Sequence, residues 1–231
     1  MLRAIIFDFD GILVNSEPLI LKLMQQMAAL EGWNLTDEEY YRDYLALDDR
    51  GVVELLFRRH GRQVDRRLRD ELIAWKERAY WEAIQDGLPP FPDAIDFVHR
   101  VGKRFPLAIA SGSLRAEIEH LLEKIRLRDA FPVLVTADDT VSSKPDPEVY
   151  LEAVKRLQVA AFNPRLGHAP LRAAECLAIE DAAAGVDAAH AAGMKCMALA
   201  HSLPREGLVH AEWIFDNFGE VEFERIVAEF E

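Results

Sequence analysis

Residues 2–11 of the chain read LRAIIFDFDG, and this stretch decides the fold. The apolar run from Leu2 to Phe9, rich in Ile and Phe, is typical of a strand that is buried on both faces. Gly11 follows closely and predicts a tight loop. Asp8 and Asp10 stand where the strand ends. The stretch therefore predicts a buried strand that carries two carboxylates at its carboxyl end.

The segment after this strand has helical periodicity. Pro18 stands where a helix can begin, and apolar residues recur at helical spacing over Leu19–Leu30. Similar patterns cover Asp49–His60 and Asp65–Gln85, and no strand signal occurs before Gly87. We therefore expect an all-helical block inserted after the first strand.

After a proline-rich linker at Leu88–Pro92, strands and helices alternate. We expect strands at Leu107–Ala110, Val133–Thr136, Cys176–Ile179, Cys196–Ala200 and Trp213–Phe215, and helices at Asp93–Lys103, Ser113–Ile125, Pro147–Leu157 and Ala183–Ala192. Ala160–Ala174 is less regular and is expected to be a loop. The alternation implies right-handed crossovers and a parallel sheet. The predicted class is α/β: a doubly wound parallel sheet in residues 1–14 and 89–231, with a smaller all-helical domain in residues 15–88.

Polar residues cluster where these strands end. In an open parallel sheet, ligands bind beyond the carboxyl ends of the strands. Besides Asp8 and Asp10, these ends carry Ser111-Gly112-Ser113, Lys144 after a loop, and Glu180-Asp181. Converging carboxylates need a countercharge, and Mg²⁺ suits carboxylates together with a phosphate. The Ser-Gly-Ser turn and the lysine suit an anion. The residues therefore predict a Mg²⁺-dependent phosphoryl-transfer site.

The chain resembles the haloacid dehalogenase-like superfamily. DFDGILVNSEP, SGS, Lys144-Pro145 and AIEDAAAGVDAAHAAGM match the four motifs of that superfamily in order. The helical block resembles its C1-type cap, as in the branch of phosphoglycolate phosphatases and β-phosphoglucomutases. The resemblance covers almost the whole chain and implies a Rossmann-like core with a separate cap domain.

The resemblance also implies a role for each strand-end residue. Asp8 would be the nucleophile that forms an aspartyl-phosphate, and Asp10 would act as general acid and then as general base. The carboxylate of Asp8, the main-chain carbonyl of Asp10 and the carboxylate of Asp181 would hold the metal, with Glu180 as a ligand directly or through water. The transferring phosphoryl group would be held by Ser111, the Gly112 N–H and Lys144. The Lys144–Pro145 peptide bond would be cis.

Each of these residues also has a structural interpretation. Asp8 and Asp10 could belong to a turn, and Glu180 and Asp181 could stabilise the start of a helix. Lys144 could be an exposed loop lysine. For Ser113 we prefer the structural role, as the N-cap of its helix. For the others, the order of the four motifs favours the functional interpretation.

Three positions depart from the family pattern. Asn15 stands where relatives usually have Asp, Ala182 where Ser usually follows Glu-Asp, and Asp93 where Gly is usual. None is an expected ligand or nucleophile. Asn15 and Ala182 would change hydrogen bonds around the site and so affect efficiency or metal affinity.

Several kinds of protein fit this family, and a phosphatase of a small phosphorylated metabolite leads. A dehalogenase normally lacks the second carboxylate, whereas Asp10 is present. A sugar phosphomutase is the alternative, but Ile20 stands where β-phosphoglucomutases carry a histidine on the first cap helix. A non-catalytic regulatory protein that binds a phosphorylated ligand would be expected to lack the nucleophile, whereas Asp8 is present.

Substrate choice is expected to lie with the cap. Ser16, Arg50 and Lys76 could face the pocket from the cap, and Arg115 could reach it from the core. Arg50 and Lys76 could equally be solvated helix-face charges. If they face inward, a second anionic group on the substrate, as in a sugar acid or sugar phosphate, is favoured.

The composition excludes other classes. Lys plus Arg number 27 and Asp plus Glu number 40 in 231 residues, so the net charge is −13, which argues against a nucleic-acid partner. Cys176 and Cys196 are too few for a disulfide framework. No stretch has the length of a membrane span or of a secretory signal. We expect a cytoplasmic monomer without membrane partners.

Overall fold

In the computed structural model, which describes residues 1–45, 47–162 and 169–230, the apolar run near the start of the chain forms strand β1 (Ala4–Phe7). The other strands are β2 (Leu107–Ala110), β3 (Val133–Val135), β4 (Cys176–Glu180), β5 (Lys195–Leu199) and β6 (Trp213–Phe215). All pair in parallel in the order β3-β2-β1-β4-β5-β6. The chain adds strands on one side of β1 and then on the other, so the predicted doubly wound sheet is confirmed.

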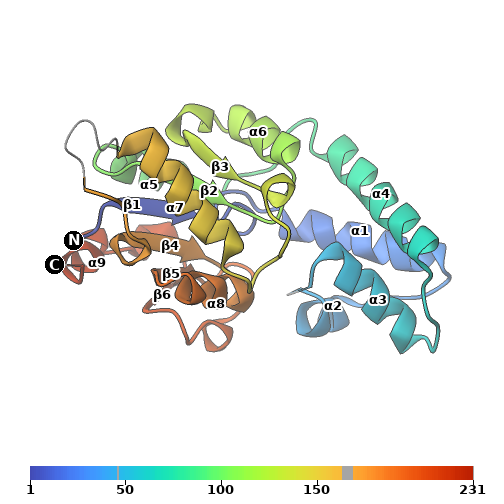
Figure 1. Ribbon diagram of the computed structural model, residues 1–231. Coiled ribbons are helices and arrows are strands. Elements are labelled where there is room, and N and C mark those ends of the chain that lie inside the picture. Colours follow the sequence, from blue (N-terminus) through green and yellow to red (C-terminus); the bar gives the residue numbers. More distant parts are fainter. Residues whose placement is uncertain (46, 163–168, 231) are drawn as a thin grey trace. The chain divides into compact units, whose positions relative to one another are not determined.

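The helices of the sheet domain lie between these strands in the chain, except the last helix, which follows β6 (Figure 1). They are α5 (Ala94–Gly102), α6 (Arg115–Lys124), α7 (Glu148–Ala161), α8 (Ala183–Ala191) and α9 (Phe223–Ala228). Short 3₁₀ turns occur at η1 (Arg128–Ala130), η2 (Ala137–Asp139), η4 (Ala173–Glu175), η5 (Arg205–Gly207) and η6 (Phe218–Glu220). Helix α7 extends four residues beyond its expected end, and residues 163–168 of the expected loop lie outside the described residues.

Alternate residues of the sheet face two different cores. Ala4 and Ile6 belong to a buried cluster with residues of α7 and α8, the two helices that pack on that face. Phe7 points to the other face, where its ring meets the rings of Phe97 and Phe131 edge-on, at centroid distances of 6.2 and 5.5 Å. Because β1 is covered on both sides, it is buried along its whole length.

A second unit consists of helices among the residues described between 16 and 86. These helices are α1 (Glu17–Leu30), α2 (Asp37–Asp43), α3 (Asp49–Arg59) and α4 (Arg66–Ala83). Helix α4 packs against α1 and α3 around a core that includes Met27, Tyr44 and Phe57. The contacts divide the chain into residues 16–86 and residues 1–15 with 87–231. These boundaries differ by one and two residues from the expected ones. A separate role for each part stays a prediction.

Helix α2 was not expected from periodicity. Only one of its residues, Tyr40, is buried, so its apolar stripe is too short to show in the pattern. Its start is set by a capping box: the Glu39 N–H donates to Thr36 Oγ1 at 3.2 Å, and the Thr36 N–H donates to Glu39 Oε2 at 3.0 Å. The Thr-x-x-Glu spacing was the signal that could have revealed this helix.

The return to the sheet domain explains one departure from the family pattern. Asp93 has a φ of 61° and therefore adopts the left-handed conformation that favours glycine. Aspartate tolerates this conformation better than most residues. Close by, Val14 bridges Pro90, and the Asn15 N–H donates to Pro89 O at 3.0 Å. None of the described helices is both long and apolar enough to cross a membrane.

Candidate active site

The carboxyl edge of the sheet brings the expected site residues together. Asp8 follows β1, Ser111 follows β2, and Glu180 and Asp181 lie at the end of β4. Lys144 lies in the loop between β3 and α7, and its peptide bond to Pro145 is cis, as the resemblance implied. Because β1 lies between β2 and β4, Asp8 stands at the centre of this group.

Lys144 links the group. Its ammonium Nζ lies 2.8 Å from Asp8 Oδ1, 2.6 Å from Glu180 Oε1 and 3.0 Å from the carbonyl oxygen of Ala110. All three N–H donors of the ammonium are therefore used. Burial by itself lowers the pKa of Lys144, but the two carboxylates raise it above its ordinary value, so the lysine stays charged. The interpretation of Lys144 as an exposed loop residue is wrong, because only 15% of its side chain is exposed.

Three buried carboxyl groups surround the single positive charge of Lys144. Oxygen atoms of Asp8, Glu180 and Asp181 lie within 4.8 Å of one another, and all three residues are buried. Burial raises the pKa of Asp8 to about 7, against the opposing effect of Lys144. Burial, with the charges of Asp8 and Glu180, also raises the pKa of Asp181 well above its ordinary value. This cluster of buried carboxyl oxygens fits a divalent cation, whose charge would favour the ionised forms of the carboxyl groups.

Two glycines make room for these carboxylates. A Cβ on Gly11 would lie 1.8 Å from Asp181 Oδ2, and the φ of +72° at Gly11 is itself unfavourable for other residues. A Cβ on Gly185, in the first turn of α8, would lie 2.1 Å from Glu180 Cδ. No side chain other than that of glycine fits at either position without moving a carboxylate.

Asp10 is held on one side only. Its Oδ2 accepts a hydrogen bond from Ser113 Oγ at 2.5 Å, while its buried Oδ1 has no hydrogen-bond partner among the described residues. The expected role of Ser113 as an N-cap is wrong: the helix begins at Arg115 with Leu114 at the cap position, and the Ser113 hydroxyl is used by Asp10 instead. The free oxygen of Asp10 is the one that could exchange a proton with a ligand.

The turn after β2 has the features expected of an anion site. The Ser111 side chain is buried, and its Oγ accepts a hydrogen bond from the Ser113 N–H at 3.1 Å. Apart from Gly112 itself and its two chain neighbours, no described residue has an atom within 4 Å of a Cβ built on Gly112. The Gly112 backbone therefore borders open space that a phosphate could approach.

Sequence reasoning missed three residues of this region. Ser202 Oγ donates a hydrogen bond to Asp181 Oδ2. The His201 ring stacks on Phe91 at a centroid distance of 3.8 Å, and its Nδ1 lies 2.8 Å from the Gly11 carbonyl oxygen. Both residues follow β5, and the rule about strand ends would have found them had it been applied to that strand. The third residue, Tyr150, donates a hydrogen bond to Glu180 Oε1 from inside α7, where no local pattern marks it.

The structure shows the local contacts of the expected specificity residues within their own units. Lys76 Nζ lies 3.0 and 3.1 Å from the two carboxylate oxygens of Asp49, and Arg50 is exposed on α3. The Ser16 hydroxyl is buried without a hydrogen-bond partner among the described residues. Arg115 Nη2 donates to Asp139 Oδ2 at 2.6 Å and so fastens the turn after β3. Their part in substrate choice stays a prediction.

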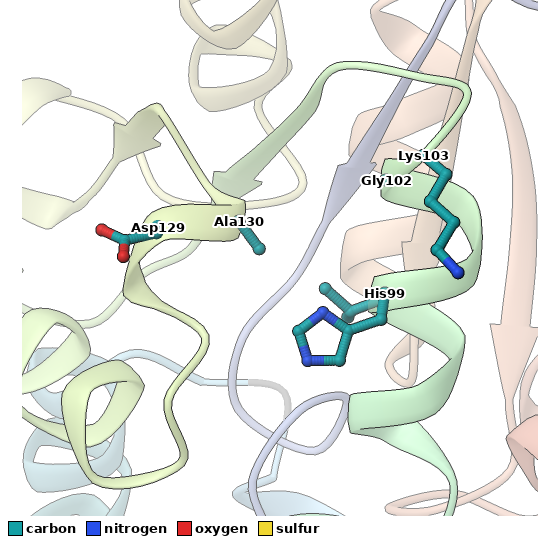
Figure 2. Close-up of a pocket in the computed structure, with 6 residues that line it drawn as sticks. His99, Gly102, Lys103, Asp129 and Ala130 are labelled. Atoms are coloured by element: carbon teal, nitrogen blue, oxygen red, sulfur yellow. The ribbon is translucent and has the colours of Figure 1, made fainter.

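A surface hollow of the sheet domain lies away from the carboxylates. Figure 2 shows it between the end of α5, with His99 in the helix and Lys103 just after it, and η1, which carries Asp129 and Ala130. These two elements come just before β2 and β3 in the chain, so the hollow lies at the amino edge of the parallel sheet. Asp8 lies at the opposite edge, and the hollow therefore has no part in the chemistry of the carboxylate group.

The fold and the strand-end residues define a class: an α/β protein with a doubly wound parallel sheet, a buried aspartate after its first strand and a helical insert. Residues 5–199 match the family model for haloacid dehalogenase-like hydrolases. The chain belongs to the haloacid dehalogenase-like hydrolase family, as its motifs indicated.

Known relatives agree with this assignment. The chain is 28% identical over 208 residues to the phosphorylated carbohydrates phosphatase of Thermotoga maritima, covering 87% of each protein. It is 29% identical over 193 residues to hexitol phosphatase B of Escherichia coli K12, covering 83% of this chain and 81% of that protein. This chain is likewise a phosphatase.

A solved structure supports the fold alone. The β-phosphoglucomutase of Clostridium difficile superposes with a TM-score of 0.84 at 19% identity, covering 100% of this chain and 97% of that one. The arrangement expected from the resemblance, a Rossmann-like core with a helical insert, is therefore confirmed.

Proposed function

We propose that the protein is a Mg²⁺-dependent phosphatase that hydrolyses a small phosphorylated metabolite through a phosphate ester on Asp8. The observation that carries the proposal is the pairing of Lys144 with Asp8 inside the buried acidic group. A nucleophilic carboxylate and a cation for the phosphoryl oxygens stand side by side, and Asp10 lies two residues further on.

The metal follows from the same group. Asp8, Asp181 and the main-chain carbonyl of Asp10 would hold Mg²⁺, with Glu180 as a further ligand directly or through water. When bound, Mg²⁺ supplies positive charge that favours the ionised form of Asp8 and offsets the charge of the phosphoryl group.

In the first step, a carboxylate oxygen of Asp8 attacks the phosphorus atom. The new bond joins Asp8 to the phosphoryl group, and the bond to the leaving oxygen breaks. Asp10 gives its proton to that oxygen, so the leaving group departs as an alcohol. Ser111, the Gly112 N–H and Lys144 stabilise the charge on the transferring oxygens.

In the second step, Asp10 takes a proton from a water molecule, and that water attacks the phosphorus atom. The bond between phosphorus and Asp8 breaks, which releases inorganic phosphate and restores both carboxyl groups. Asp10 can act in both directions because Ser113 holds only one of its oxygens.

The substrate we propose is a sugar phosphate or a phosphorylated sugar acid. The two relatives named above are a phosphorylated carbohydrates phosphatase and hexitol phosphatase B. A second anionic group on the substrate would be bound by Arg50 or Lys76, as their charges suggest. To do so, Lys76 would have to share its ammonium with Asp49.

The test is hydrolysis of an aryl phosphate and of a panel of sugar phosphates, with Mg²⁺ and with a chelator. Wild type is expected to release phosphate only with Mg²⁺, and Asp8→Asn to release none in either condition. Equal release by the two proteins would refute the mechanism. Transfer of phosphate between two hydroxyls of one sugar, without release, would identify a phosphomutase instead.

The same panel tests the specificity residues. We expect Arg50→Ala to raise KM for substrates with a second anionic group and to leave KM for neutral sugar phosphates unchanged. If Arg50→Ala has the wild-type KM for both groups of substrates, Arg50 does not bind a second anionic group.

A further inference from the structure

Tyr150 connects helix α7 to the charged group at the strand ends. Its side chain is completely buried, and its hydroxyl donates a hydrogen bond to Glu180 Oε1. The same oxygen atom accepts the hydrogen bond from Lys144 at 2.6 Å. The Lys144 Nζ also lies 5.3 Å from the centre of the Tyr150 ring, which is within the range of a cation–π contact. Tyr150 therefore contacts both members of the ion pair.

Glu180 has little freedom to move. Only 1% of the residue is exposed, and on the side of α8 its carboxyl group fills the space that a Cβ on Gly185 would occupy. From α7, the Tyr150 hydroxyl donates a hydrogen bond to one oxygen of the same carboxyl group. Burial and the charge of Glu180 raise the pKa of Tyr150 well above its ordinary value, so the phenol stays neutral and remains a donor.

The position of Lys144 depends on this carboxylate. Of its three hydrogen bonds, the one to Glu180 is the shortest, and the others go to Asp8 and to the Ala110 carbonyl oxygen. If Glu180 moves, the ammonium loses the anchor opposite Asp8. We propose that Tyr150 is a positioning residue of the active site, which holds Glu180 so that Lys144 stays within reach of Asp8. The effect on catalysis rests on the proposed phosphatase function, whereas the effect on Lys144 does not.

A purely structural role for Tyr150 makes different predictions. The ring packs in the core between α7 and the sheet, together with Ala153 and Leu157. Phenylalanine would fill the same space, so Tyr150→Phe removes only the hydroxyl. If the hydroxyl merely satisfies a buried group, its loss lowers stability and leaves Lys144 where it is.

The experiment compares Tyr150→Phe with a matched control, Tyr40→Phe. Tyr40 is also buried, and its hydroxyl donates to the Glu17 carboxylate at 2.6 Å, but it lies in the helical unit. We expect Tyr150→Phe to lower kcat for sugar phosphates about tenfold, which is about 1.4 kcal/mol, with little change in KM. Tyr40→Phe is expected to keep the wild-type kcat. An unchanged kcat in Tyr150→Phe, in a wild type that is active, would overturn the inference.

A second measurement does not depend on activity. The chain has seven lysines, so ¹⁵N-lysine labelling gives a simple NMR spectrum in which Lys144→Arg identifies the Lys144 ammonium signal. We expect Tyr150→Phe to shift this signal and to speed its hydrogen exchange, and Glu180→Gln to do the same. Tyr40→Phe is expected to leave it in place. A Lys144 signal unmoved by Tyr150→Phe would refute the positioning role.

The two measurements separate the inference from the proposed function. A wild type that hydrolyses no phosphate ester refutes the phosphatase proposal, and the NMR result still decides whether Tyr150 positions Lys144. An active wild type with an unmoved Lys144 signal refutes the inference and leaves the phosphatase proposal standing. Thermal unfolding of each variant shows whether the change is confined to the site.

Discussion

The Lys144 ammonium lies 2.8 Å from Oδ1 of Asp8, although 136 positions separate the two residues in the sequence. Both side chains are largely buried, so the attraction between them is screened less than it would be at the surface. The pair places a fixed positive charge beside the carboxylate that is expected to receive the phosphoryl group.

Removing the charge of Lys144 should damage catalysis more than substrate binding. We expect Lys144→Met to lower kcat by about 10²–10³-fold, the loss typical of one donor to a developing oxyanion. Lys144→Arg should not restore it, because the planar guanidinium cannot make the same three contacts. Steady-state phosphate release checks this, with circular dichroism as the control for folding. A kcat within a few fold of wild type would contradict the assigned role.

Mg²⁺ should stabilise the fold more at high pH than at low pH. The Asp8 carboxyl group has a pKa of about 7 in the folded protein and an ordinary value of 3.8. Between these values the folded state holds a proton that the unfolded state has released. The stability of the metal-free protein should therefore fall as the pH rises from about 4 to about 7, and stay lower above that.

Thermal unfolding at about pH 5 and about pH 8, with Mg²⁺ or a chelator, measures this effect. The increase in Tm on adding Mg²⁺ should be larger at the higher pH, because bound metal favours the ionised carboxylate. Asp8→Asn is the control, since it removes the titrating group and should reduce the difference between the two pH values. An increase that is the same at both pH values in wild type would count against a metal at this carboxylate.

The effect of Ser113→Ala on kcat/KM should depend on the leaving group of the substrate. Without the hydrogen bond from Ser113 Oγ, Asp10 loses the contact that holds its carboxyl group in place. We expect kcat/KM for an alkyl phosphate to fall about tenfold or more, because an alkoxide needs a proton in order to leave. An aryl phosphate with an acidic phenol should be affected less.

Ser113→Thr keeps the hydroxyl and should restore most of the activity towards the alkyl phosphate. If Ser113→Ala slows both kinds of substrate equally, the serine does not act through proton transfer by Asp10. If Ser113 acted as an N-cap, Ser113→Ala would lower helix stability, and its effect on the rate would not depend on the leaving group.

Gly185→Ala should disturb both activity and stability. The added Cβ would lie 2.1 Å from Glu180 Cδ, so either the carboxylate or the start of α8 must shift, at a cost of about 1–3 kcal/mol. Gly102→Ala, at the end of α5, is a suitable control, because its Cβ would come no closer than 3.3 Å to a leucine side chain. Urea unfolding and phosphate release together check this. A fully active and stable Gly185→Ala protein would contradict the close packing of Glu180 against Gly185.

The sequence alone determined the class of fold and most of the site. The apolar run of β1 predicted a strand buried on both faces, and the alternation after Leu88 predicted a parallel sheet. Since parallel strands end at one edge, Asp8, Ser111, Lys144 and Asp181 could be placed together without coordinates. These inferences rest on local patterns and on a topological rule.

Tertiary structure decided which atoms pair within that edge. Ser113 donates to Asp10 rather than capping its own helix, and Tyr150 and Lys144 share one oxygen of Glu180. These hydrogen bonds join residues that are 30 to 103 positions apart in the sequence. Local periodicity cannot show such pairs. Side-chain partners in a buried site are chosen by the packing of whole elements and by the cost of leaving a buried polar group unpaired, and these are fixed only when the sheet and its helices assemble.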